Sequence, residues 1–595
     1  MSPPSPSPLY LDIDGTPVHA VLHRPSPDVA DRGGRAAVVF CPPFGWEEVC
    51  SYRVLREWAS RLAAAGHPAL RLTLPSCGDS GGDPRDPGRV AAWTEAVARA
   101  ARLMSAQPGG AGVVVIGLGL GGLLAYRAAA GDAPIEGLVL WATPARGRAL
   151  VRQLRAFARI EEEQTSEGLP APEPLRDGEL EGGGFLLSAQ TQADLEATDL
   201  SSLTLPRGLS RGALLLDRDG IAADARLRAA LEAQGVAVMG GPGDGYAAMT
   251  SHPQQAEVPD RTLAGVASWL GGGPPAAGVP EAAPIATSAF AVLEHEGAEL
   301  VEEPIEIPRD FGSLSGILAT PHEGDSWLCV VMLNAGAIRR IGPNRMWVEA
   351  ARRWAAQGIA SLRLDVEGIG DADGPVTPYA SDGALYVPEL IPQVTAALDF
   401  LEHRGIAQRF VLAGLCGGAY WSLHAGLGDP RVGACLMLNP RALVYDSGLA
   451  PARDLRRAFT QPLTWRRLHQ NVTPARILAV LRWLLGAPRR RLTGRSAGAP
   501  RSREDRTGAV VQRLIDSPHR ALLLFSEGEP LEEELTSAGQ LTRLEQSDGV
   551  RVERVPVRDH TLRPCFAQAL THAALDRAVE QEAELAGPAR RRAAG

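Results

Sequence analysis

The sequence repeats itself, and this constrains the fold more than any single motif does. Residues 54–84 read VLREWASRLAAAGHPALRLTLPSCGDSGGDP, and residues 346–376 read MWVEAARRWAAQGIASLRLDVEGIGDADGPV. Identical residues in the two segments are separated by 292 positions: Gly66 and Gly358, Arg71 and Arg363, Gly78 and Gly370, Asp79 and Asp371, Gly82 and Gly374. Later in the copies the separation is 297, because a short insertion intervenes. An internal duplication of this length predicts two copies of one fold.

A segment rich in proline, glycine and alanine separates the copies. It reads GGGPPAAGVPEAAPIATS and cannot form a hydrophobic core, which is typical of a linker. We therefore expect a first domain at 1–270, a linker at 271–289 and a second domain at 290–585. The last residues, 586–595, are expected to form a disordered tail.

Within each copy, short apolar runs alternate with amphipathic stretches of helical type. The runs lie at 36–40, 69–74, 113–117, 137–141 and 213–217, and again at 329–333, 361–365, 410–414, 434–438 and 521–525. Continuous apolar strands separated by helices predict an α/β fold, with a doubly wound, mostly parallel sheet covered on both faces. Insertions at about 144–210 and 441–515 follow the fourth run of each copy. They are expected to form caps, because loops at the carboxyl ends of parallel strands build the ligand site.

The second copy places a cysteine where a strand turns into a helix, in VLAGLCGGAY at 411–420. A strand, a Gly-x-nucleophile-x-Gly turn and a helix form a nucleophile elbow, whose tight turn requires small flanking residues. Gly414 and Gly418 hold the flanking positions, so Cys416 is the candidate nucleophile. The start of the following helix favours the thiolate. The alternative is a buried cysteine that acts as a small apolar residue.

Two later strand ends supply an acid and a base in the chain order that such an elbow requires. The run at 521–525 leads into SEGEP, where Glu529 is the first choice for the acid and Glu527 the alternative. The next apolar run leads into RDHTLRP, which places His560 at the mouth of a loop after a strand. A histidine at that point is suited to act as general base.

An oxyanion hole requires two backbone N–H groups near the nucleophile. We expect one from Gly417 and the other from the loop after 329–333, at Gly336 and Ala337. Arg339 and Arg340 follow at once, and they are candidates to bind an anionic substrate or carrier arm. The alternative for both arginines is a solvated loop.

These segments resemble a known group of proteins. The sequence NAGAIRRIGPNRMWVEAARRWAAQGIASLRLDVEGIGDADG, the elbow GLCGGAY and the later DHTLRP resemble the α/β-hydrolase superfamily. More narrowly, they are similar to serine-aminopeptidase-like and exosortase-associated hydrolases, and through the cysteine, more distantly, to dienelactone hydrolases. The resemblance covers nearly all of both copies. It implies a Cys416–Glu529–His560 triad, with Glu527 still open as the acid because the superfamily usually has aspartate there.

The first copy lacks these groups at the matching positions. Gly119 stands where Cys416 stands, Ile221 matches Glu529, and Gly245 matches His560. Glycine has no side chain to attack or to accept a proton, so we interpret the first copy as a degenerate, non-catalytic domain. A different catalytic set, built on Cys77 or His252, is the alternative.

The second insertion is strongly basic. Residues 441–520 hold 17 arginines and 5 acidic residues, although the whole chain has a net charge of −9. Three interpretations remain open: a lid over the active site, an interfacial helix on anionic lipid, or a docking face for an acidic acyl-carrier protein or an anionic glycan. The acidic overall charge gives no reason to expect a nucleic-acid partner.

Seven scattered cysteines without a regular spacing suit reduced thiols. No secretory signal pattern and no membrane-spanning apolar run is found in the sequence, so a cytoplasmic location is expected. The leading hypothesis is a hydrolase or acyltransferase that acts on a small-molecule ester, thioester or amide, without metal or organic cofactor. The competing hypothesis is a non-catalytic binding scaffold built from two hydrolase folds.

Overall fold

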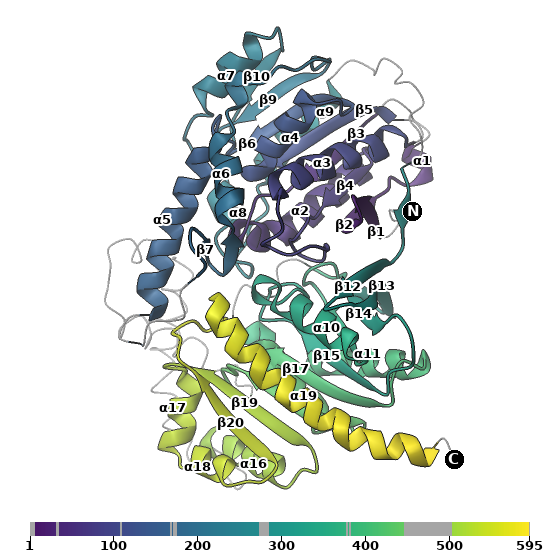
Figure 1. Ribbon diagram of the computed structural model, residues 1–595, viewed down its shortest axis with the longest axis vertical. Helices are drawn as coiled ribbons and strands as arrows, with labels where there is room; N and C mark the ends of the chain where they lie inside the picture. Colours follow the sequence, from purple (N-terminus) through teal and green to yellow (C-terminus); the bar gives the residue numbers. More distant parts are fainter. Residues whose placement is uncertain are drawn as a thin grey trace, which may run out of the picture.

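The computed structural model describes residues 6–30, 35–107, 110–166, 169, 175–272, 285–375, 379, 382–444 and 503–593. Two nine-stranded sheets, one from each half of the chain, form the centres of two domains (Figure 1). The first sheet has the order β10-β9-β6-β5-β3-β4-β2-β1-β11. Its strands are β1 (Ser7–Ile13), β2 (Thr16–His23), β3 (Arg35–Cys41), β4 (Ala69–Leu72), β5 (Gly110–Leu118), β6 (Ile135–Trp141), β9 (Gly212–Leu216), β10 (Val238–Gly241) and β11 (Thr287–Ser288).

The second sheet has the order β12-β13-β14-β16-β15-β17-β18-β19-β20. Its strands are β12 (Ala291–His295), β13 (Ala298–Arg309), β14 (Gly312–Pro321), β15 (Leu328–Leu333), β16 (Ala360–Asp365), β17 (Arg409–Leu415), β18 (Val432–Leu438), β19 (Arg520–Ser526) and β20 (Val550–Val555). In each sheet an antiparallel start leads into parallel strands, and eight strands have the same order in both sheets, with β11 and β12 as edge strands that do not correspond. The predicted fold class is therefore confirmed.

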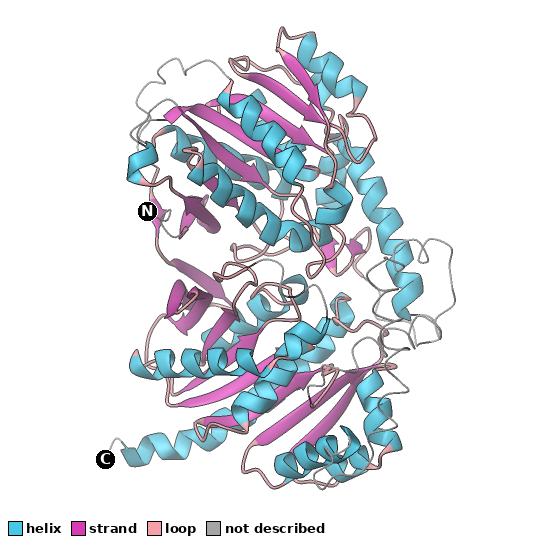
Figure 2. Ribbon diagram, turned by 180° about the vertical axis from the view of Figure 1, so that it is seen from behind, coloured by secondary structure: helices cyan, strands magenta, loops and turns pink. Residues whose placement is uncertain are grey.

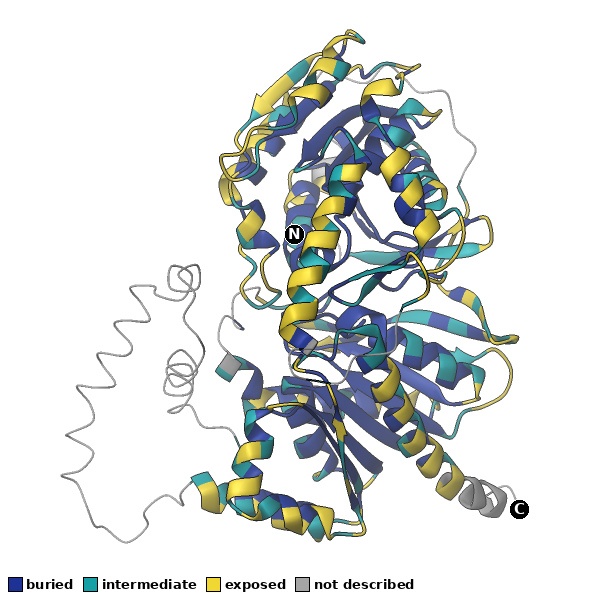
Figure 3. Ribbon diagram, turned by 60° about the vertical axis from the view of Figure 1, so that its left-hand side comes forward, coloured by how far each residue is buried: buried dark blue, intermediate teal, exposed yellow. Residues whose placement is uncertain are grey.

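Helices cover both faces of each sheet (Figure 2). In the first domain they are α1 (Pro27–Ala30), α2 (Trp46–Ala64), α3 (Arg89–Ser105), α4 (Leu120–Ala130), α5 (Gly147–Ser166), α6 (Ala189–Ala197), η1 (Leu200–Ser202), α7 (Ala225–Glu232), α8 (Tyr246–Met249) and α9 (Asp260–Gly271). Helices α3 and α4 share one apolar cluster with the sheet, and α2 and α9 share the opposite one. The buried residues accordingly concentrate in the strands and the inward helix faces (Figure 3).

The second domain repeats this two-sided packing. Its helices are η2 (Pro343–Arg345), α10 (Met346–Ala356), η3 (Asp382–Tyr386), η4 (Pro388–Leu390), α11 (Ile391–His403), α12 (Gly417–Gly426), α16 (Arg503–Ile515), α17 (Pro530–Ser537), α18 (Gln540–Glu545) and α19 (Cys565–Ala593). Helices α11 and α12 cover one face of the sheet, and α10 and α19 cover the other. No helix among the described residues is long and apolar enough to cross a membrane.

Two boundaries differ from those expected from the sequence. Residues 586–593, expected to be disordered, continue α19, since alanine and arginine favour a helix there. Thr287–Ser288, placed in the linker from sequence, pair with β1 as strand β11. The insertion at about 144–210 contains α5, α6 and the β7–β8 hairpin (Leu180–Gly182 and Phe185–Leu187). Most of the basic insertion at about 441–515 lies outside the described residues.

The two domains meet through reciprocal contacts between equivalent residues. Arg71 of the first domain pairs with Asp371 of the second at 2.5 Å, and Arg363 pairs with Asp79 at 3.2 Å. These are the residues that the sequence repeat equates. Each arginine contacts the aspartate of the other domain, and the two contacts use equivalent positions. The domains therefore pack about a pseudo-two-fold axis, as two subunits of a symmetric dimer do.

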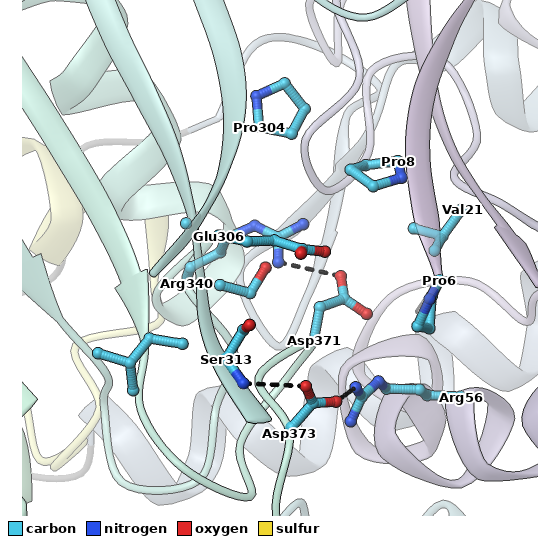
Figure 4. Close-up of a pocket in the computed structure, with 13 residues that line it drawn as sticks. Pro6, Pro8, Val21, Arg56, Pro304, Glu306, Ser313, Arg340, Asp371 and Asp373 are labelled. Atoms are coloured by element: carbon cyan, nitrogen blue, oxygen red, sulfur yellow. Dashed lines mark hydrogen bonds and ion pairs between the residues drawn. The ribbon is translucent and has the colours of Figure 1, made fainter. Parts of the chain in front are cut away.

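The same reciprocity holds for backbone acceptors. Arg53 donates to the carbonyl of Ala372 at 2.7 Å, and its equivalent Arg345 donates to the carbonyl of Ser80 at 3.1 Å. A pocket at one side of this interface is lined by residues of both domains (Figure 4). There Arg56 pairs with Asp373 at 2.7 Å. The acceptor loops follow β4 and β16, so the carboxyl edges of these strands point into the interface.

Candidate active site

Cys416 lies at the turn between β17 and α12 with φ 58° and ψ −113°. The turn requires the flanking glycines, because a Cβ on Gly414 would lie 2.2 Å from the carbonyl carbon of Gly418, and one on Gly418 would lie 2.3 Å from the oxygen of Asn334. Cys416 is the N-cap residue of α12, so its thiol lies at the positive end of the helix dipole. The local sequence therefore places Cys416 at a tight turn with a strained, positive-φ backbone.

The acid and the histidine reach this elbow from the next two strand ends. Glu529, which is 4% exposed, places Oε1 2.8 Å from Nδ1 of His560. Glu527 is exposed. His560 in turn lies close enough to Cys416 to lower the pKa of its thiol. The structure thus joins Cys416, His560 and Glu529 in one chain of contacts and leaves Glu527 outside it.

The electrostatics of the pair favour a thiolate beside an imidazolium. Burial disfavours the charged thiolate, but the charge of His560 and its hydrogen bond outweigh burial and lower the pKa of Cys416 to about 7. Burial and the nearby Arg441 lower the pKa of His560, but its contacts with Cys416 and Glu529 prevail and raise it to about 9. The two shifts describe one ion pair, since each group stabilises the charge of the other.

The loop expected to form the oxyanion hole faces the elbow. Ile338 donates its N–H to the carbonyl of Ala335 at 3.1 Å, which leaves Gly336 and Ala337 at the tip of a tight turn. A Cβ placed on Gly336 or on Gly417 would lie 3.7 Å or 3.1 Å from the side chain of Leu385. The two predicted donor segments therefore flank one side chain, which belongs to the η3 segment.

Arg339 and Arg340 lie elsewhere than the sequence led us to expect. They are 2% and 1% exposed and point into the interface with the first domain. Arg339 donates to Glu48 at 2.7 Å, and Arg340 pairs with Asp79 at 3.0 Å. Their interpretation as substrate-binding groups is wrong, because buried guanidinium groups held by several carboxylates are not available to an anionic ligand.

Several groups around the triad were not found from the sequence. The hydroxyl of Tyr386 lies 3.4 Å from the sulfur of Cys416, and Nε of Arg441 lies 3.2 Å from Nε2 of His560. Asn439 donates to the backbone oxygen of His560 at 2.8 Å. Asn439 ends the apolar run of β18, and a polar residue at the carboxyl end of a parallel strand is a signal that sequence reasoning could have used. Tyr386 ends the short helix η3 and Arg441 lies on an irregular loop, and neither position carries such a signal.

The first domain retains the elbow without its chemistry. Gly119 has φ 54° and ψ −116°, nearly the angles of Cys416, and its N–H donates to Trp141 at 2.9 Å as that of Cys416 donates to Leu438. A Cβ on Gly119 would lie 3.3 Å from the hydroxyl of Tyr246. The fully buried Tyr246 therefore fills the space into which a nucleophile would project.

Polar partners fix Tyr246 in that space. Its hydroxyl donates to Glu47 at 2.8 Å, and the guanidinium of Arg218 lies 4.6 Å from the centre of its ring. Burial, with Glu47 beside it, raises the pKa of Tyr246 far above its ordinary value. Tyr246 therefore stays neutral and serves as a packed structural residue in this space.

The other matched positions of the first domain hold no catalytic group. Ile221 is 69% exposed, and Gly245 donates its N–H to Asp219 at 2.6 Å. Of the alternative residues, Cys77 packs against side chains of the apolar core, and the exposed His252 packs its ring against Trp46. Each of the two is thus engaged with another side chain.

The strand order and the elbow are those of an α/β-hydrolase fold. Residues 38–280, which lie in and just after the first domain, match the model of the alpha/beta hydrolase family. The match covers the copy whose elbow carries Gly119. No curated protein matches the chain.

Solved structures resemble parts of the chain. A dienelactone hydrolase from Anabaena variabilis ATCC 29413 has 14% identity and a TM-score of 0.28, covering 46% of this chain and 95% of its own. Est1E from Butyrivibrio proteoclasticus, with bound ferulic acid, has 17% identity and a TM-score of 0.30, covering 44% and 95%. DcsB in complex with a substrate analogue has 16% identity and a TM-score of 0.32, covering 45% and 98%.

Proposed function

We propose that the second domain is a cysteine-dependent hydrolase or acyltransferase that acts on an ester, thioester or amide. The observation that carries the proposal is the contact chain from Cys416 through His560 to Glu529, built on an elbow at a helix N-terminus. A nucleophile paired with a base that a third group orients is the general arrangement for acyl transfer.

In the first half-reaction the Cys416 thiolate attacks the acyl carbonyl carbon, and a C–S bond forms. The carbonyl electrons move onto oxygen, where the N–H groups of Gly417 and of the Gly336–Ala337 turn are the proposed donors. The protonated His560 then gives its proton to the leaving oxygen, nitrogen or sulfur as the bond to the acyl carbon breaks. A thioester acyl-enzyme and a neutral His560 remain.

In the second half-reaction a nucleophile with an acidic proton attacks the thioester. His560 accepts that proton, the C–S bond breaks, and the thiolate–imidazolium pair is restored. Water as the nucleophile gives hydrolysis, and an amine or alcohol gives acyl transfer. Glu529 supports His560 in both halves because it holds Nδ1 and balances the positive charge.

The test is acylation of the full chain by activated esters and thioesters of varied chain length, followed by intact mass and peptide mapping. We expect a thioester on Cys416, and we expect it to turn over by hydrolysis in buffer or by transfer to an added amine. Both the thioester and the turnover should be lost in Cys416→Ala. Cys435→Ala is the matched control, since Cys435 is buried. Equal turnover by Cys416→Ala and by the unchanged chain would disprove the proposal, and no acylation by any probe would favour the non-catalytic scaffold instead.

A further inference from the structure

The loop that carries His560 is held at both ends by the first domain. Arg558 donates its N–H to the carbonyl of Thr165 at 3.0 Å, and Cys565 donates its N–H to the carboxylate of Glu181 at 2.8 Å. Thr165 belongs to α5 and Glu181 to the β7–β8 hairpin, which together we call the first-domain cap. Because the two donors lie on either side of His560 in the chain, the first-domain cap brackets the histidine.

Arg563 links the same loop to the first-domain cap by side-chain contacts. Its Nη1 lies 2.9 Å from Oε1 of Glu161 on α5. Its guanidinium also lies 4.9 Å from the centre of the ring of Trp46, which belongs to α2 of the first domain and not to the first-domain cap. Its Nε donates to Asp559 at 2.7 Å. Arg563 is 15% exposed, so these ionic contacts are partly shielded from water.

Asp559, the residue before His560, organises the loop from within. Its carboxylate accepts from the N–H and the hydroxyl of Thr561 at 3.1 Å and 2.9 Å, and from the N–H of Arg563 at 3.2 Å. Burial raises the pKa of Asp559, but Arg563 and these hydrogen bonds outweigh it and keep the pKa below its ordinary value. A shift of Arg563 would therefore pass directly to the backbone beside His560.

The tip of the hairpin fits closely against this loop. Gly184 has φ +84°, and a Cβ there would lie 1.7 Å from Nδ2 of Asn344 and 2.1 Å from the carbonyl oxygen of Arg563. The carbonyl of Gly184 also accepts from the thiol of Cys565 at 3.5 Å. Such close approach between backbones fixes the distance between the first-domain cap and the loop.

We propose that the first-domain cap positions the catalytic histidine of the second domain, with Glu161 and Glu181 as positioning residues. The inference rests on the proposed function of Cys416 and His560. It gives the degenerate domain a role in catalysis that does not use its own elbow.

The first experiment compares Glu161→Gln with Glu162→Gln, a neighbour on α5 that is exposed. Alkylation of Cys416 by iodoacetamide is followed against pH by peptide mass spectrometry. Besides His560, the titratable or charged groups described against the pair are Tyr386, Arg441 and Glu529. All three are kept in both variants.

We expect half-maximal alkylation near pH 7 in the unchanged chain and in Glu162→Gln. In Glu161→Gln it should move toward the ordinary thiol value of about 8.5, because a misplaced His560 no longer stabilises the thiolate. With an acyl substrate, kcat should fall about 10- to 100-fold with little change in KM, the effect of a small misplacement of a catalytic group. Glu161→Asp should recover part of both losses.

A double variant tests whether Glu161 acts on His560 through Arg563 or only stabilises the fold in general. Glu161→Gln combined with Arg563→Gln should be no worse than Arg563→Gln alone, because both changes break the same contact. If Glu161→Gln does not fold, Glu181→Gln weakens the contact of the first-domain cap with Cys565 at the other end of the loop. It is expected to shift the alkylation profile in the same direction. A profile and a kcat in Glu161→Gln equal to those of Glu162→Gln would overturn the inference. If no acyl substrate is turned over but the alkylation profile still shifts, the proposed function fails and the positioning stands.

Discussion

At the scale of single residues, the second elbow and its degenerate twin differ by which side chain fills one space. Cys416 occupies it in the second domain, and in the first the hydroxyl of Tyr246 lies 3.3 Å from where a Cβ on Gly119 would be. The backbone angles of the two elbows are nearly the same. The two elbows therefore differ in their side chains and hardly at all in their backbone.

The choice of acid is a prediction that two neighbouring glutamates can test. Glu529→Gln should lower kcat by about 10³- to 10⁴-fold, because the amide no longer holds His560 in its tautomer or balances its charge. Glu527→Gln should leave kcat nearly unchanged, since Glu527 is exposed and lies outside the contact chain. Steady-state kinetics of the two variants side by side decides between them, and equal losses would contradict the assignment.

A second prediction concerns the reactivity of Cys416 with pH. The contact with His560 lowers the pKa of Cys416 to about 7, so the thiolate persists down to that pH and is lost below it. In His560→Gln the neutral amide removes this stabilisation, and half-maximal alkylation should move upward by one pH unit or more, to about 8.5 or above. His519→Gln is the control, because His519 binds the backbone of Val432 instead. An unchanged profile in His560→Gln would show that the ion pair does not form.

Local patterns explain which site residues could be predicted. Cys416, Glu529 and His560 each follow a strand, so chain order and strand ends were enough to bring them together. Arg339 and Arg340 also follow a strand, but the sequence of a loop reads the same whether its partner is a substrate or another domain.

At the scale of elements, the first-domain cap gives a prediction on the hairpin tip. Gly184→Ala should destabilise the protein by about 1–3 kcal/mol, since its Cβ must displace backbone and side-chain atoms of the second domain. Gly208→Ala is the matched control: Gly208 also has positive φ, but nothing lies within 4 Å of its added Cβ. Thermal unfolding of both variants separates the clash from the strain of the left-handed backbone. Equal destabilisation would mean that the tip does not fit closely.

The parallel strands were predictable because continuous apolar runs leave few other structures. The antiparallel strands β1, β2, β13 and β14 were not identified, since their alternation of exposed and buried residues is interrupted and each lies at the start of its sheet. Helix α19 continued past Gly587 and Pro588, residues that usually end a helix.

At the scale of the whole molecule, the repeat predicted two equal folds but not how they meet. The sequence equates Arg71 with Arg363 and Asp79 with Asp371, and nothing in either copy indicates that each arginine pairs with the aspartate of the other copy. That exchange is a property of the assembled interface. It makes the two domains resemble a symmetric dimer joined by a linker.

The exchange predicts matched effects from equivalent substitutions. Asp79→Asn and Asp371→Asn should each destabilise the chain by about 3–5 kcal/mol at neutral pH, because each removes one carboxylate charge from a buried cluster of arginines. Asp260→Asn is the control, as its pair with Arg61 is exposed and contributes little. Urea unfolding of the full chain measures all three, and a large effect from only one of the two buried aspartates would contradict the reciprocal arrangement.

The ion pairs of Asp79 and Asp371 also predict how the difference in unfolding free energy between the unchanged chain and each variant depends on pH. Burial raises the pKa of both aspartates, but the facing arginines prevail and hold the pKa of Asp79 and of Asp371 below the ordinary value. A carboxylate with a lowered folded pKa contributes stability above its unfolded pKa of about 3.9 and loses it as the pH falls toward the folded value. The gap in unfolding free energy between the unchanged chain and Asp79→Asn should therefore be full at pH 7 and narrow below about pH 4. A gap that stays constant down to pH 3 would mean that the charge of Asp79 contributes nothing to the interface.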